Sequence, residues 1–168
     1  MGDFTKNSAA SVEFYKTLYA SIKKAKLPQL MLNEHRGYVT ASENEDKFDK
    51  VDVRYVLKDG TQVPFQVRNY SLEWWKPGFP VRDTKLKNKN EWEKLLAGEL
   101  DSVWWAFGAY VFAPSEFGSF KFLKIKIVPG EALRKNAENV VGERTFDDDN
   151  HVTYIADPRS TAFLRDWS

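Results

Sequence analysis

The clearest pattern of apolar and polar positions lies in residues 51–68, where two alternating runs flank Lys58-Asp59-Gly60. A period of two predicts strands, and glycine supplies the positive φ of a tight turn, so the segment predicts a β-hairpin. A bulged turn at Gly60 pairs Leu57 with Thr61, Tyr55 with Val63, Val53 with Phe65 and Val51 with Val67, and it makes one face wholly apolar. A two-residue turn at Asp59-Gly60 would instead place apolar residues opposite charged ones, with Phe65 facing Arg54 and Val67 facing Asp52. We therefore expect the bulged register, in which Asp52 faces Gln66.

Other segments show helical spacing or continuous apolar runs. Residues 8–25 predict a helix with one apolar face, made of Val12, Tyr15, Leu18, Tyr19 and Ile22. Residues 103–112 predict a strand buried on both faces. The further expected elements are a strand at 37–41, a helix at 91–97 capped by Asn90, a strand at 120–128, a helix at 131–139, a strand at 151–156 and a helical turn at 161–167.

These elements predict one α+β domain over residues 1–168, with a mixed central sheet that contains the hairpin and is flanked by helices. The segment at 70–88 is too long for a simple connector, and we expect it to be a functional loop. Lys121, Lys124 and Lys126 on the strand at 120–128 suit a sheet edge, where lysine prevents strand-to-strand aggregation.

Composition excludes several classes of function. The chain has 168 residues, 42% of them hydrophobic, and no cysteine, which removes disulfides, thiolate zinc sites and cysteine nucleophiles. Together with the absence of a signal peptide or membrane span, this predicts a cytoplasmic protein. Its 25 basic and 24 acidic residues give a net charge of +1, so bulk charge does not select a partner. No glycine-rich phosphate loop is present.

The candidate chemistry lies on the hairpin, where Asp52 stands on the first strand and Gln66 and Arg68 on the second. The order helix, short strand, hairpin, helix, buried strand resembles the PD-(D/E)XK (restriction-endonuclease-like) nuclease superfamily, with Gln-x-Arg in place of Glu-x-Lys. The resemblance implies that Asp52 bridges a metal ion, that Gln66 is a second ligand, and that Val67 offers its carbonyl. Arg68 would replace the catalytic lysine, and Glu13 in the first helix would supply an extra acidic group.

By this resemblance the protein is a metal-dependent DNA endonuclease of restriction, homing, repair or junction-resolving type. It would use one or two Mg²⁺ or Mn²⁺ ions and form a homodimer or higher homo-oligomer to cut two strands. Two residues depart from the family pattern. Gln66 brings no charge to the metal, and Arg68 stays protonated, so it cannot act as a base although it can stabilise phosphate charge.

Three alternatives remain open. The first is a non-catalytic nucleic-acid-binding module that neutralises phosphates and stacks on bases, through Arg82, Lys85, Lys87, Lys89, Trp74 and Trp75. The second is a protein-interaction domain anchored by Trp74, Trp75 and Phe79. The third is an ordinary half-exposed hairpin with a polar outer face, formed by Asp52, Arg54, Gln62, Gln66 and Arg68.

Overall fold

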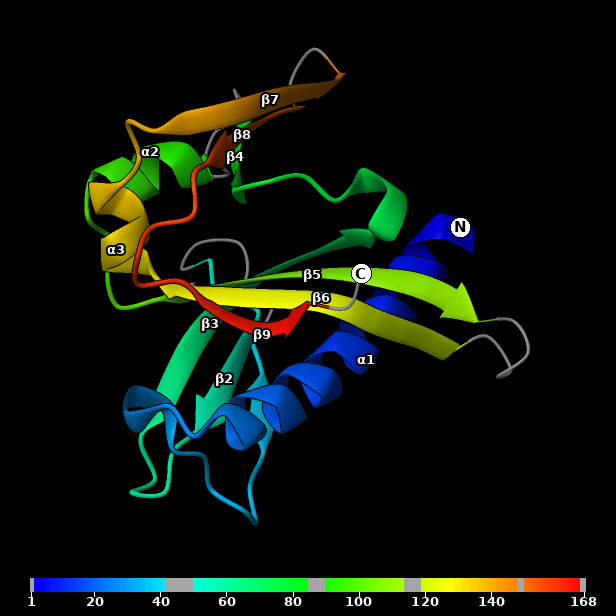
Figure 1. Cartoon of the computed structure of the whole chain (residues 1–168), viewed down its shortest axis with the longest axis vertical. Coiled ribbons are helices and arrows are strands. Elements are labelled where there is room, and N and C mark those ends of the chain that lie inside the picture. The colour runs from blue at the N-terminus through cyan, green and yellow to red at the C-terminus, as the bar shows by residue number, and fades with distance from the viewer. Residues whose placement is uncertain (1, 42–49, 85–89, 114–118, 148–149, 167–168) are drawn as a thin grey trace.

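A mixed sheet forms the centre of the protein (Figure 1). The computed structural model describes residues 2–41, 50–84, 90–113, 119–147 and 150–166. Within these residues the sheet has six strands in the order β1-β2-β3-β5-β6-β9. The strands are β1 (Tyr38–Thr40), β2 (Val53–Val56), β3 (Gln62–Ser71), β5 (Trp104–Ala113), β6 (Ser119–Pro129) and β9 (Ala162–Asp166). β3 is antiparallel to β2 and parallel to β5, which confirms the α+β class and the mixed sheet that contains the hairpin.

Helix α1 (Gly2–Ala25) covers one face of this sheet (Figure 1). Phe14, Leu18 and Ile22 are spaced one helical turn apart and are fully buried against the sheet. Val12, which we expected on this apolar face, is exposed. The helix lies very close to β5, since a Cβ atom added at Gly108 would be 2.6 Å from the Phe14 ring.

A second layer covers the opposite face and builds its own apolar core from Val81, Leu95, Phe107, Leu133 and Ile155, among others. It contains a three-stranded sheet in the order β4-β8-β7 and two short helices (Figure 1). The elements are β4 (Phe79–Thr84), α2 (Glu91–Leu96), α3 (Gly130–Lys135), β7 (Val140–Asp147) and β8 (Asn150–Ile155). Two 3₁₀ turns, η1 (Pro28–Leu30) and η3 (Leu72–Trp74), complete the described elements.

The hairpin has the predicted bulged register over most of its length. Val53 pairs with Phe65 and Tyr55 with Val63, and the Leu57 N–H donates to the Thr61 carbonyl at 2.8 Å. Gly60 has a φ of 90°, the left-handed conformation that the turn requires.

The predicted pair Val51 with Val67 is wrong. Lys50 has a φ of 56°, and Val51 packs in the apolar core of the second layer, whereas Val53 and Val67 pack on the α1 side. The side chains before and after Asp52 therefore point to opposite faces of the sheet, and β2 begins only at Val53.

Four other predictions are corrected. Residues 161–167 do not form a helical turn, because residues 162–166 pair with β6 as strand β9. β6 is therefore an inner strand, and Lys126 is 1% exposed and pairs with Asp157 at 2.8 Å, so it is not an edge lysine. The segment at 70–88 contains η3 and β4. The helix expected over 131–139 ends at Lys135 and is followed by β7.

A search of the described helices found none whose length and apolar content would let it cross a membrane.

Candidate functional site

Alternation along β3 assigns its side chains to the two layers. Phe65 and Val67 point into the core under α1, whereas Gln66 and Arg68 point toward α2. Gln66 is only 2% exposed, because the second layer covers this face of the sheet. Its burial contradicts the alternative of an ordinary hairpin whose polar outer face is half exposed.

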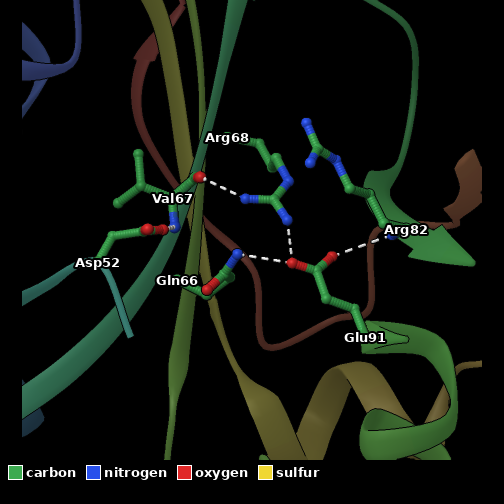
Figure 2. A network of polar contacts seen from close by, with 6 residues as sticks. All are labelled: Asp52, Gln66, Val67, Arg68, Arg82 and Glu91. Carbon is green, nitrogen blue, oxygen red and sulfur yellow. Dashed lines mark hydrogen bonds and ion pairs between the residues drawn. The ribbon is translucent and has the colours of Figure 1, made fainter. Parts of the chain in front are cut away.

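The buried carboxylate of Glu91 is the centre of a hydrogen-bond network that includes Gln66 and Arg68 (Figure 2). Glu91 is the first residue of α2, and the Asn90 side chain caps the helix by accepting the Glu93 N–H at 3.2 Å. The Glu91 Oε2 atom accepts hydrogen bonds from Gln66 Nε2 at 2.6 Å and from Arg68 Nη2. Its Oε1 atom accepts from the backbone N–H of Arg82 at 3.0 Å. Glu91 thus joins β3, β4 and α2.

Arg68 is a permanent cation held in this network. Its Nη1 donates to the carbonyl of Val67 at 2.9 Å, its Nη2 pairs with Glu91, and its side chain is 15% exposed. Burial alone would lower the pKa of Arg68, but the charges of Glu91 and Asp52, with Tyr70, outweigh burial and raise the pKa above its usual value. Arg68 therefore cannot serve as a base.

The Asp52 carboxylate completes the backbone pairing where the strand changes faces. The Asp52 N–H donates to the Phe65 carbonyl at 2.9 Å, and its Oδ2 accepts the Val67 N–H at 2.7 Å. The carboxylate thus replaces the strand carbonyl that would otherwise accept this N–H.

Arg82 supplies a second cation beside Arg68. It lies on β4 and is exposed, and Figure 2 shows its guanidinium beside the Arg68 side chain. The positive charge of Arg68, followed by desolvation, lowers the pKa of Arg82. Within the described ranges, the structure gives the Arg82 guanidinium no hydrogen bond or ion pair. The two like charges repel each other, so an anion placed between them would be stabilised by both.

Two buried polar atoms of the network have no hydrogen-bond partner among the residues that the structure describes. They are Gln66 Oε1, an acceptor, and Arg68 Nε, a donor. Buried polar groups are nearly always paired, so each of these atoms has room for a partner from outside the described residues, such as a water molecule or a ligand group.

Among the site residues predicted from the sequence, five lie together in the structure: Asp52, Gln66, Val67, Arg68 and Arg82. The structure does not bring Glu13 to them, because α1 covers the opposite face of the sheet (Figure 1). Lys85, Lys87 and Lys89 lie outside the described residues.

The aromatic residues of the segment at 70–88 separate into two groups. Trp75 stacks on Phe107 with ring centroids 4.3 Å apart, and Phe79 is buried in the second core. Only Trp74 of the three predicted residues is exposed, at 47%. The three residues therefore do not form one surface cluster, as the protein-interaction alternative requires.

The sequence did not indicate that Glu91 belongs to this site. An acidic residue in the first turn of a helix is common on electrostatic grounds, and the sequence assigned Glu91 only to the start of a helix. Its contact with Gln66 spans 25 positions of the chain, and no local pattern encodes that distance.

The donor set does not fit a Mg²⁺ ion as it is arranged. The Val67 carbonyl already accepts from Arg68, and Glu91 is occupied by three donors. The Asp52 carboxylate already accepts the Val67 N–H, and Gln66 adds one amide oxygen beside a permanent cation, whereas Mg²⁺ prefers several hard oxygen ligands. In the part of the chain that the structure describes, no three His, Cys, Asp or Glu side chains are placed to hold a metal ion.

Comparison with family models, curated proteins and solved structures found no match to this chain.

Proposed function

We propose that the protein binds nucleic acid without cleaving it, and that a backbone phosphate sits against Arg82 and Arg68. The observation that carries this proposal is the pair of adjacent guanidinium groups (Figure 2), of which that of Arg82 belongs to an exposed residue and has no partner among the described residues. A phosphate between them would accept charge-assisted hydrogen bonds and remove their repulsion. The unpaired Arg68 Nε supports this position for the anion.

Nucleic acid is favoured over a small anion for two reasons. The chain has the order α1, β1, the β2–β3 hairpin, α2 and β5 on which the resemblance to nucleases rests, with η3 and β4 inserted between the hairpin and α2. Lys85, Lys87 and Lys89 also lie within seven positions after Arg82 in the sequence, and a cluster of lysines strengthens the attraction to a polyanion.

Binding is tested with labelled single-stranded, duplex and branched oligonucleotides at several salt concentrations, with fluorescence anisotropy as the measurement. Arg82→Gln should weaken binding roughly 10-fold, and it should lower the slope of log affinity against log salt by roughly 0.7–0.9, the loss of one phosphate contact. Arg36→Gln is the matched control, because it removes the same charge from an exposed residue between η1 and β1. The control should change neither quantity.

The same samples test whether the protein cleaves nucleic acid. We expect no cleavage by the wild type with Mg²⁺ or Mn²⁺, and none by Arg68→Lys, which restores the lysine of the nuclease pattern. Cleavage that Asp52→Asn abolishes would overturn the non-catalytic function. Absence of binding at roughly 100 µM protein in low salt, the weak end of non-specific binding, would overturn the proposal as a whole.

A further inference from the structure

A row of residues crosses the three-stranded sheet next to the Arg68–Arg82 pair. Arg82 on β4 pairs with Val152 on β8, and Val152 pairs with Arg144 on β7. Residues directly opposite one another on neighbouring strands point to the same face, so both arginines project from one face of this sheet. Two strand spacings separate them, which places their Cα atoms roughly 10 Å apart.

Trp74 lies at the far end of this row. The guanidinium carbon of Arg144 is 4.0 Å from the centroid of the Trp74 ring, a distance at which cation–π attraction holds the ring in place. Trp74 is nevertheless 47% exposed, although Arg144 covers one side of its indole. The row therefore presents a fixed aromatic surface to solvent at one end and two guanidinium groups at the other.

Tyr70 lies on β3, next to the guanidinium end of the row. It is close enough to Arg68 and Arg82 to affect the pKa of both, and it also affects the pKa of Tyr154 on β8. The buried Gln66 donates from its Nε2 atom to Glu91, and its Oε1 atom has no partner in the described part of the chain. The face thus offers guanidinium cations at one end and an exposed aromatic ring at the other.

We infer that the ligand is single-stranded nucleic acid, with a phosphate at Arg82 and Arg68 and a neighbouring base stacked on Trp74. This inference rests on the proposed function and names its substrate class. In a duplex both faces of each base are already stacked on neighbouring pairs, so a duplex could offer only its phosphates to this surface. In a single strand a base is free to leave its neighbours and stack on an aromatic side chain.

The test compares four ligands of equal length: oligo(dT), oligo(U), a duplex, and an abasic deoxyribose-phosphate strand. Wild-type protein should bind oligo(dT) or oligo(U) more tightly than the duplex, and the two single strands show whether the sugar is deoxyribose or ribose. Trp74→Leu should weaken binding to the preferred single strand roughly 10-fold, whereas Trp74→Phe should stay within about 3-fold because phenylalanine can still stack.

Two controls separate stacking from charge and from loss of folding. Trp74→Leu should leave the salt dependence and the affinity for the abasic strand unchanged, since it removes no phosphate contact. Phe163→Leu alters another exposed aromatic residue, on β9, and should not change binding.

The outcomes distinguish this inference from the proposed function. Equal affinity for duplex and single strand, or an unchanged affinity of Trp74→Leu for the preferred single strand, would overturn the single-strand inference. The phosphate site would survive that result if Arg82→Gln still weakened binding. If none of the four ligands binds, both proposals fail.

Discussion

The buried carboxylate Glu91 allows the sharpest test of the network, through the substitution Glu91→Gln. Glu91 is 2% exposed and accepts from Gln66, Arg68 and the Arg82 N–H. A glutamine amide presents an NH₂ group where one carboxylate oxygen was, so in either orientation a donor would face a donor. The substitution also removes the negative charge that pairs with Arg68.

The expected loss of stability follows from the burial of this pair. Removing one partner of a buried ion pair costs about 3–5 kcal/mol. Because the Arg68 side chain is 15% exposed and Asp52 stays near it, we expect the lower end of this range, about 3 kcal/mol. For a domain of this size, that loss lowers the melting temperature by roughly 6–12 °C.

Urea denaturation followed by circular dichroism measures the free energy of unfolding. Glu131→Gln is the matched control, because Glu131 forms an exposed pair with Lys135 on α3, and such pairs contribute about 0.2–1 kcal/mol or less. Arg68→Met combined with Glu91→Gln should recover at least about 1 kcal/mol relative to the sum of the single changes. Equal costs for Glu91→Gln and Glu131→Gln would refute the buried-pair reasoning.

Two further predictions concern the rest of the core. Burial lowers the pKa of Lys126, so the unfolded chain binds more protons from its folded-state pKa up to about 10.4, the unfolded value. Wild-type stability should therefore rise relative to Lys126→Met as the pH increases through that window, and a constant difference in urea titrations would contradict the shift. Gly108→Ala should cost about 1–3 kcal/mol, because its Cβ would lie 2.6 Å from the Phe14 ring. Adding Phe14→Leu should then cost less than it does in the wild type, and additive losses would disprove the close contact.

The local pattern was sufficient to predict the hairpin. Alternation and the glycine at position 60 selected the bulged register, because a shift of one residue would have exchanged its apolar and polar faces. The main apolar face of α1 was predicted only in part, since Leu18 and Ile22 are buried but Val12 is exposed. Helical spacing identifies a face to within a turn, and packing against the sheet decides which residues lie at its centre.

Pairing between distant segments could not be predicted. The five residues of β9 became a strand because the edge of β6 was available to pair with them. Lys126 of β6 is buried over the rings of Trp75, Phe79 and Phe107. Val51 packs in the second core and not beside Val53, because the chain changes faces at Asp52, before β2 begins. Neither event leaves a periodic signal in the local sequence.

For the candidate site, the sequence by itself determined which residues β3 presents on each face, and therefore that Gln66 and Arg68 project together. The tertiary structure alone decided that this face is buried, that Glu91 meets both side chains, and that Arg82 stands beside Arg68. The physical reason is that alternation is fixed by the geometry of consecutive residues. The charges that meet in a buried network are set by which elements the whole chain packs together.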